Sequence, residues 1–125
     1  MTDALKQFDN QQYLTIETFR KNGQGVKTPV WFVRDGNSLL VWTESGSGKA
    51  KRIRRDGRVR ITPSTGSGQP LGEWVEAHAV ADGSPETVER VVKLLRKKYG
   101  LTFEAFRLLG RMRSAAHITL SLRLD

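Results

Sequence analysis

Apolar and polar residues alternate along much of the chain, and this pattern predicts a protein built mainly of β-strands. The clearest segment is residues 116–124, where aliphatic residues occupy every second position from Ile118 onward. Alternation with a period of two places these side chains on one face of a strand, where they can meet a core. Five more segments alternate in the same way or are rich in β-branched and aromatic residues. They are residues 13–20, 28–34, 38–44, 58–62 and 73–81.

Helical spacing of apolar residues marks two segments in the second half of the chain. Ser84 and Pro85 suit the cap and first turn of a helix, and Gly100 is typical of a helix end. A second helix is expected from Thr102 to about Met112. The residues expected to be buried are Val88, Val91, Val92, Leu95 and Tyr99 in the first helix and Phe103, Phe106 and Leu109 in the second. Two short helices are also expected, one within the first dozen residues and a basic one before the strand at 58–62.

Short turns connect the first three predicted strands, which would therefore form a meander. Pro29 has no N–H to donate, so the second strand is expected to pair fully only beyond it. Residues 63–72 contain prolines and glycines and predict a long loop. Six short antiparallel strands with one apolar face each are most economically closed into a small barrel. We therefore expect a single domain over residues 1–125, mainly β with α insertions.

Two of the predicted strands indicate which side chains point inward. In the fourth strand Val59 and Ile61 alternate with arginines, so they should face the core. In the fifth strand Ala77, Ala79 and Ala81 share one face, which indicates that something approaches that face closely. Either a tightly packed barrel interior or a bound ligand would account for these small residues.

Positive charge is concentrated in one stretch of the chain. The formal net charge is +8, and residues 49–60 hold seven cationic side chains against one acid, Asp56. The cations are Lys49, Lys51, Arg52, Arg54, Arg55, Arg58 and Arg60. Like charges repel within a Debye length of about 10 Å, so this stretch is favoured by a nearby anion. The alternative is a solvated basic helix face that binds no ligand.

A loop of glycine and serine, residues 45–48, precedes the basic helix. Its small residues let backbone N–H groups approach a ligand, and the positive end of the helix points the same way. Arginine adds planar, bidentate donors that suit phosphate or carboxylate. Together these features predict a phosphate-binding turn.

Most enzyme signatures are missing from the sequence. The chain has no cysteine, which excludes disulfides and thiolate metal sites. Gly48 and Lys49 resemble the end of a P-loop, but Ala50 stands where that motif needs Ser or Thr. No G-x-S-x-G motif is present. His78 and His117 have no ligand partner at a recognisable spacing, so we interpret them as structural and expect no metal site.

Charge and hydropathy limit the cellular location and the kinds of partner that we expect for this protein. The N-terminus lacks the apolar run of a signal peptide, and no segment approaches the ~20 apolar residues needed to span a bilayer. We therefore expect a soluble, cytoplasmic protein with no membrane partner. An isoelectric point near 10.3 favours anionic partners. A nucleic-acid-binding barrel would need aromatic residues among the charges, but residues 44–73 hold none, so nucleic acid is not the favoured partner.

The sequence predicts a basic turn on a barrel and shows no evident acid, base or nucleophile, so we assign no catalytic residue. It suits hydride transfer, in which a cofactor carries the reactive atoms and the protein supplies orientation and electrostatics. Three runs of residues then resemble the flavin and deazaflavin oxidoreductase superfamily, the split β-barrels related to pyridoxamine 5′-phosphate oxidase. They are TPVWF at 28–32, LVWT at 40–43, and SGKAKRIRRD at 47–56 followed by Arg58 and Val59. Within this superfamily the chain is most similar to small actinobacterial and related proteins described as F420-dependent enzymes.

The resemblance covers residues 13–124 and implies a six-stranded antiparallel split β-barrel that forms a homodimer, with a cofactor in a groove at the interface. It implies that the cofactor's phosphate, and for F420 its acidic oligoglutamate tail, are held by Lys49, Lys51, Arg52 and Arg55. The cofactor ring would be lined by Thr28, Pro29, Val30 and Trp31. Donors near the phosphate would come from Thr43, Glu44, Ser45, Ser47 and Gly48. One departure is Gly57, where members of the family commonly carry proline.

The number of cations favours F420 over FMN as the cofactor. FMN needs one phosphate site, whereas F420 adds several carboxylates, and seven cations exceed what a single phosphate requires. The implied activity is hydride transfer between the reduced deazaflavin and a small organic acceptor, such as an activated C=C bond or a quinone-like ring. FMN is the alternative cofactor, and a non-catalytic cofactor-binding protein is a further alternative. Tyr13 and Tyr99 are candidate proton donors, unless their hydroxyl groups are satisfied within a core.

Overall fold

The computed structural model describes residues 3–112 and 116–124 and has the predicted order of elements, apart from one strand. In chain order the elements are α1 (Asp3–Lys6), β1 (Tyr13–Phe19), β2 (Gly25–Trp31), β3 (Val33–Asp35), β4 (Ser38–Glu44), α2 (Gly48–Arg55), β5 (Arg58–Ser64), β6 (Val75–Asp82), α3 (Pro85–Tyr99), α4 (Leu101–Met112) and β7 (His117–Leu124). The prediction of a mainly β fold with inserted helices is confirmed.

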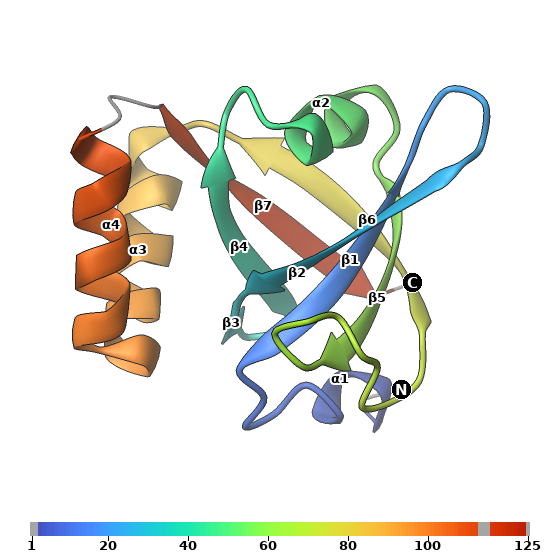
Figure 1. Ribbon diagram of the computed structural model, residues 1–125, viewed down its shortest axis with the longest axis horizontal. Coiled ribbons are helices and arrows are strands. Elements are labelled where there is room, and N and C mark those ends of the chain that lie inside the picture. The colour runs from blue at the N-terminus through green and yellow to red at the C-terminus, as the bar shows by residue number, and fades with distance from the viewer. Residues whose placement is uncertain (1–2, 113–115, 125) are drawn as a thin grey trace.

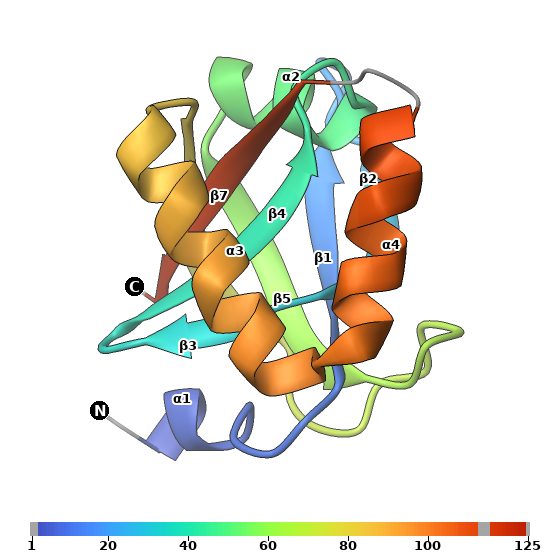
Figure 2. The same cartoon turned by 90° about the vertical axis from the view of Figure 1, so that its left-hand side faces the viewer.

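The strands form one antiparallel sheet in the order β2-β1-β5-β6-β7-β4-β3. The sheet curls until β2, at one edge, lies close to β4, near the other edge, without pairing with it (Figure 1). This is the split barrel that the sequence predicts. α2 lies at one end of the barrel and α1 at the other, while α3 and α4 lie side by side along one flank (Figure 2).

The predicted strand at residues 28–34 is in fact two strands, β2 and β3, which belong to opposite edges of the sheet. The chain breaks at Phe32, whose ring is buried in the barrel. Its backbone N–H donates to the Tyr99 hydroxyl at 3.2 Å, and its carbonyl accepts from the Lys98 amine at 2.8 Å. These groups therefore bond to α3 instead of a neighbouring strand. Because β2 pairs with β1 and β3 pairs with β4, the predicted meander of three strands is wrong.

Pairing of β2 does not begin beyond Pro29, contrary to the prediction. Its register with β1 runs from Trp31 opposite Tyr13 to Gly25 opposite Phe19, so Pro29 lies within the paired region. β2 is an edge strand, in which alternate N–H groups face away from the sheet. A proline at such a position removes no hydrogen bond from the ladder.

Apolar side chains from both halves of the curled sheet fill the barrel interior. Val59 and Ile61 are buried in this cluster, as predicted from the alternation in β5. Ala77 and Ala79 of β6 are buried in the same cluster, and Ala81 packs against it. The packed interior, rather than a ligand, therefore accounts for the small residues on this face.

Gly57 lies where two backbone segments approach closely. Its carbonyl accepts a hydrogen bond from the N–H of Ala79 at 2.7 Å. A Cβ at position 57 would lie 2.7 Å from the carbonyl oxygen of Ala79, which is closer than real Cβ atoms approach other atoms. The close approach leaves no room for a side chain at position 57, so glycine fits the packing between α2 and β6.

The two long helices build a second, smaller apolar cluster against β3 and β4. Val91, Val92 and Leu95 of α3 and Phe103 of α4 are buried there, as predicted. Phe106 and Leu109 are instead 55% and 57% exposed, so the prediction that α4 buries them is wrong. Helical spacing alone does not say how much of the apolar face of a helix a neighbour covers.

Candidate functional site

A pocket of about 490 Å³ opens at the split of the barrel. Its walls come from β2 and β4 and from the helices α3 and α4, and one end is formed by the start of α2. The walls are mainly apolar, whereas this end carries hydroxyl groups, a carboxylate and an amine. The pocket therefore offers an apolar section joined to a polar one.

Aromatic rings stack in pairs along the apolar section. Trp31 of β2 stacks on Tyr99 with centroids 4.6 Å apart and planes 9° apart. Trp42 of β4 stacks on His117 with centroids 3.9 Å apart and planes 8° apart. The ring of Phe103 lies between these pairs, 6.5 Å from Trp31 and 5.5 Å from Trp42. These contacts hold the tryptophan rings in fixed orientations and give the pocket flat apolar walls.

One polar atom on this wall lacks a partner. Nε1 of Trp42 is buried, and within the described part of the chain it has no hydrogen-bond acceptor. A buried donor without an acceptor costs about 1–3 kcal/mol.

The polar end of the pocket is built by the beginning of α2. Ser47 caps this helix, because its Oγ accepts a hydrogen bond from the N–H of Ala50 at 3.2 Å. The same Oγ lies 3.5 Å from Oγ1 of Thr43, at the end of β4. The sequence folds this way because serine is a favoured helix cap and the preceding glycine allows a tight turn. Two hydroxyl groups and the positive end of a helix thus meet at one place.

Lys49, in the first turn of α2, also lines this end of the pocket. Burial lowers the pKa of the Lys49 amine, the nearby positive charge of Arg52 lowers it further, and the Glu44 carboxylate partly opposes both effects. A bound anion would raise that pKa, because it would stabilise the charged amine. The geometry and the charge of this end therefore fit a phosphate or carboxylate group.

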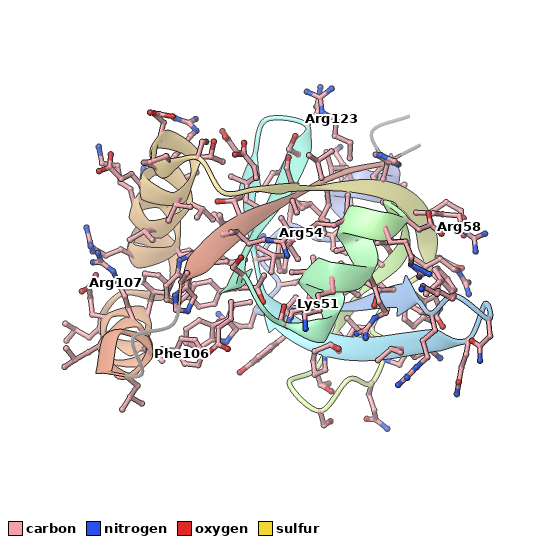
Figure 3. All side chains as sticks on the ribbon, turned by 90° about the horizontal axis from the view of Figure 1, so that it is seen from above. Lys51, Arg54, Arg58, Phe106, Arg107 and Arg123 are labelled. Carbon is pink, nitrogen blue, oxygen red and sulfur yellow. The ribbon has the colours of Figure 1, made fainter. Side chains whose placement is uncertain are left out.

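Most of the residues that the sequence nominates for a cofactor line this pocket. They are Thr28, Pro29, Val30, Trp31, Thr43, Glu44, Ser47 and Lys49. The other nominated residues, Ser45, Gly48, Lys51, Arg52 and Arg55, do not line it. Ser45 accepts hydrogen bonds from Arg54 through its carbonyl at 2.8 Å and its hydroxyl at 2.9 Å. Lys51 is exposed on α2 (Figure 3).

Arg52 and Arg55 bond to the end of β1 instead. Nε of Arg52 donates to Oγ1 of Thr18 at 2.7 Å, and Arg55 donates to the carbonyl of Phe19. The basic stretch that is continuous in sequence is therefore divided in space. Lys49 faces the pocket, and the arginines lie on the neighbouring surface of the barrel.

Several lining residues were not nominated from the sequence. They are Trp42, Leu95, Phe103, Phe106, Leu109 and His117. Strand alternation could have indicated Trp42, because it shares a face with Glu44. The residues of α3 and α4 gave no such signal, because their helical spacing is equally typical of a core.

The titratable side chains of the site give few candidates for acid or base chemistry. Tyr99 is held in place, since its hydroxyl lies 2.6 Å from the carbonyl oxygen of Gln12 and accepts from the N–H of Phe32. Burial raises the pKa of the Tyr99 hydroxyl to about 12. Tyr13 lines the pocket and is the better placed candidate proton donor. Over residues 3–112 and 116–124, no cluster of side chains suits a metal ion and no helix is long and apolar enough to cross a membrane.

Comparisons with known proteins agree with this architecture. Residues 1–120 match the family model of pyridoxamine 5′-phosphate oxidase. No curated protein matches the chain in sequence. Among solved structures, the heme storage protein of Vibrio cholerae is 14% identical, with a TM-score of 0.72 over 97% of this chain and 87% of that chain.

Two further solved structures have the same fold. A conserved protein of Mycobacterium tuberculosis is 20% identical, with a TM-score of 0.70 over 99% of this chain and 84% of that chain. An F420 reductase is 15% identical, with a TM-score of 0.64 over 98% of this chain and 94% of that chain. At these identities the likeness shows a shared fold, and function must be argued from the site.

Proposed function

The chain belongs to the pyridoxamine 5′-phosphate oxidase family, and from this premise we propose that it is an F420-binding oxidoreductase. It would transfer hydride between the reduced deazaflavin and a small organic acceptor, such as an activated C=C bond or a quinone-like ring. The observation that carries the proposal is the pocket of about 490 Å³ that joins an aromatic section to a cationic end. F420 has the same two parts, a planar ring and an anionic chain.

Different side chains of the pocket would bind different parts of the cofactor. Lys49 and the hydroxyl groups of Ser47 and Thr43 would hold the phosphate at the start of α2. Residues 28–31 and the ring of Trp42 would orient the planar ring and exclude water from it. When bound, the reduced cofactor would supply the hydride from C5 of its ring.

A proton must accompany the hydride in the reduction of a C=C bond. Tyr13 lines the pocket, and the hydroxyl group of its side chain is a candidate to hold that proton. The hydroxyl of Tyr99 is already bonded to backbone groups of Gln12 and Phe32. We therefore assign Tyr99 a structural role and Tyr13 the role of candidate proton donor.

A homodimer would complete the site. Phe106 and Leu109 line the pocket and are each more than half exposed, so one side of the pocket is open to solvent. Large exposed apolar side chains next to a pocket are typical of surfaces that bind a partner. A second copy of the chain on this side would exclude water from the bound cofactor.

FMN is the alternative cofactor. It would use the same aromatic walls and the same Lys49, since it also has a planar ring and a phosphate. It would leave the arginines beside β1 without an anion, and for this reason F420 is the better match. A non-catalytic cofactor-binding protein is the third alternative, and only the acceptor reaction separates it from an enzyme.

The first test is a side-by-side titration of the purified protein with F420 and FMN at physiological salt, followed by fluorescence and calorimetry. We expect micromolar or tighter binding of F420 and much weaker binding of FMN. Lys49→Gln should weaken F420 binding by about tenfold or more, because a hydrogen bond to a charged group contributes about 1.5–3 kcal/mol. Lys97→Gln is the matched control, since Lys97 is exposed on α3 and does not line the pocket.

The outcomes separate the alternatives. Tighter binding of FMN than of F420 would assign the protein to the flavin-binding members of its family. Equal effects of the two lysine variants would contradict the assignment of the phosphate site. With F420 binding established, reduction of enones and quinones by F420H₂ tests catalysis, and no turnover with any acceptor would favour the non-catalytic alternative.

A further inference from the structure

The loop between β5 and β6, residues 65–72, packs against the start of β1. A Cβ on Gly66 would lie 3.1 Å from Cζ of Tyr13 and 3.4 Å from the hydroxyl oxygen of the same ring. A Cβ on Gly68 would lie 3.7 Å from Oγ1 of Thr15, which shares a strand face with Tyr13. The backbone of the loop therefore lies directly on this face of β1, and a side chain at position 66 would press on the Tyr13 ring.

Hydrogen bonds hold the loop in this position. Oγ1 of Thr15 donates to Oγ of Ser64 at 2.8 Å, and that hydroxyl donates to the carbonyl of Thr65 at 3.0 Å. Across the loop, the N–H of Thr65 donates to the carbonyl of Gln69 at 2.9 Å. The N–H of Gln69 donates in return to Oγ1 of Thr65 at 3.0 Å. The loop is thus closed on itself and bonded to β1.

The segment after the loop is also bonded, whereas the Tyr13 side chain is not. The side-chain amide of Gln7 donates to the carbonyl of Glu73 at 2.9 Å and accepts from the N–H of Glu73 at 2.9 Å. Over residues 3–112 and 116–124, the hydroxyl of Tyr13 forms no hydrogen bond to another residue. If the loop and the ring compete for the same space, the ring is therefore the part that moves.

The register of the strands gives the direction of that movement. Tyr13 lies between Ser64 of β5, where the loop begins, and Trp31 of β2. Tyr13 and Trp31 both line the pocket. A group that pressed on Tyr13 from the loop would therefore push its ring toward Trp31 and into the pocket.

Tyr13 belongs to the end of the pocket that is distant from the phosphate site. β1 begins at the α1 end of the barrel, and α2, which carries Lys49, lies at the opposite end (Figure 1). Both Tyr13 and Lys49 line the pocket. A cofactor whose phosphate binds at Lys49 would extend its ring toward Tyr13, so an acceptor beside that ring would meet Tyr13.

An alanine at position 66 would introduce no backbone strain. Gly68 has a φ of 94°, but Gly66 is not among the glycines with a positive φ. What a methyl group at position 66 would meet is the ring of Tyr13, at 3.1 Å from Cζ and 3.2 Å from Cε2. Contacts this short require a neighbour to shift by a few tenths of an ångström. One methyl group would therefore change the pocket without changing the conformation of the loop.

We propose that Gly66 is a positioning residue, which sets the place of Tyr13 and thereby the size of the acceptor that the pocket admits. This inference rests on the proposed function, in which a small enone or quinone binds beside the ring of F420. Glycine lets the Tyr13 ring lie back against the loop and leaves room for a flat acceptor. A side chain at position 66 would push the ring forward, and acceptors with two fused rings would lose more than acceptors with one.

The test compares two quinones that differ by one fused ring. Menadione has two fused rings, toluquinone has one, and each is offered as acceptor with F420H₂. Gly66→Ala adds the methyl group, and Gln69→Ala is the matched control, since Gln69 is an exposed residue of the same loop. Tyr13→Leu removes the ring, so the double variant Gly66→Ala with Tyr13→Leu shows whether position 66 acts through Tyr13.

We expect Gly66→Ala to lower kcat/KM for menadione about tenfold more than for toluquinone, the order of discrimination that a methyl-sized change produces in an apolar pocket. The loss should appear mainly as a higher KM. Gln69→Ala should change neither acceptor. In the protein with Tyr13→Leu, Gly66→Ala should change the ratio by less than about twofold, the usual limit for sites that do not interact.

Two measurements on the protein without cofactor give independent readouts. The chain has two tyrosines, so Tyr13→Phe assigns their ring signals in NMR spectra of protein with isotope-labelled tyrosine. Gly66→Ala should shift the signals of Tyr13 and leave those of Tyr99 unchanged. The affinity for menadione, followed by quenching of tryptophan fluorescence, should fall by about tenfold. Thermal unfolding checks that each variant remains folded.

Three results would overturn the inference. They are unchanged Tyr13 signals in Gly66→Ala, an equal loss for the two quinones, and a loss that persists when Tyr13 is replaced by leucine. If the unmodified protein does not bind F420 or reduces neither quinone, the proposed function fails, and the measurements without cofactor decide the inference alone. Shifted Tyr13 signals together with weaker menadione binding would then support it. Unchanged signals, or no menadione binding by the unmodified protein, would overturn it.

Discussion

The two faces of β4 lie in different surroundings. Leu39 and Val41 are buried in the cluster that fills the barrel interior. Leu40 and Trp42 belong to the smaller cluster beside α3 and α4, where Trp42 is only partly buried. Neighbouring residues of one strand thus meet a closed core on one side and an incomplete one on the other.

The difference has a geometric cause. A sheet that curls on itself covers its inner face with its own strands, whereas two helices cover only part of the outer face. The uncovered part is the pocket of about 490 Å³, with Leu95 and Phe103 at its base. The closed core holds the strands in place, and the site lies where the second cluster is incomplete.

The largest effect is expected from a substitution in the closed core. Leu120 of β7 is fully buried in the barrel interior. Leu120→Ala should lower the free energy of unfolding by about 3–5 kcal/mol, because strands surround the cavity and cannot collapse into it. Urea denaturation measures the loss. A loss below about 1 kcal/mol would show that the interior is not closed.

The same substitution beside the pocket should cost less. Leu95 of α3 is 1% exposed, and it lines the pocket. Leu95→Ala enlarges a space that already exists, so we expect a loss of about 2–3 kcal/mol in the same denaturation experiment. Leu120→Ala is the matched control. Equal losses for the two variants would contradict the distinction between a closed and an incomplete cluster.

The affinity of the pocket for F420 should depend on pH through Lys49. The pKa of its amine is below the ordinary lysine value of about 10.4, mainly because of burial. A bound anion favours the charged amine, so affinity is greatest below this pKa and falls as the pH rises through it. The loss should reach about tenfold and should be absent in Lys49→Arg, which stays charged. Parallel pH profiles for the two proteins would contradict this role of Lys49.

Tyr99 joins the helical flank to the barrel, and its ionisation should weaken that connection. The chain has two tyrosines, so the tyrosinate absorbance of Tyr13→Phe reports Tyr99 alone. We expect a midpoint near 12, since burial raises the pKa from 10.0. Because the folded pKa is raised, this contribution to stability is present below pH 10 and is lost as the pH rises through about 12. A midpoint near 10 would mean that the hydroxyl is solvated.

The smallest effect is expected on the outer surface of α4. Leu108 is 58% exposed and does not line the pocket. Leu108→Ser should change the free energy of unfolding by less than about 0.5 kcal/mol, the usual range for exposed positions. Light scattering of the same variant tests whether a second copy covers this face. A large loss of stability together with loss of a dimer would place Leu108 in the interface.

Much of the fold could be predicted because its signals are local. Alternation in β5 and β7 and helical spacing in α3 each depend on a few neighbouring residues. The division of residues 28–34 into β2 and β3 could not be predicted in this way. It depends on Lys98 and Tyr99, which reach Phe32 across 66 and 67 positions of the chain.

The candidate site shows the same limit. The turn before α2 and the strand at residues 28–31 could be nominated, since their chemistry lies in short runs of sequence. The part of the aromatic wall that α4 contributes could not, because Phe103 meets Trp42 only after α4 folds against the sheet. Helical spacing also predicted a buried Phe106, which is 55% exposed, because spacing does not reveal how much of a helix a neighbour covers.

The amino-acid sequence by itself determined most of the strands, the helices, the barrel class and the presence of a dense positive charge. These properties follow from hydrophobic periodicity and from composition, which are local. Only the tertiary structure decided how the cationic side chains are distributed over the surface. It directs Lys49 to the pocket and brings Arg52, Arg55 and Arg58 to the end of β1 beside Arg20. The reason is that the position of each side chain depends on the packing of α2 against strands that are distant from it in sequence.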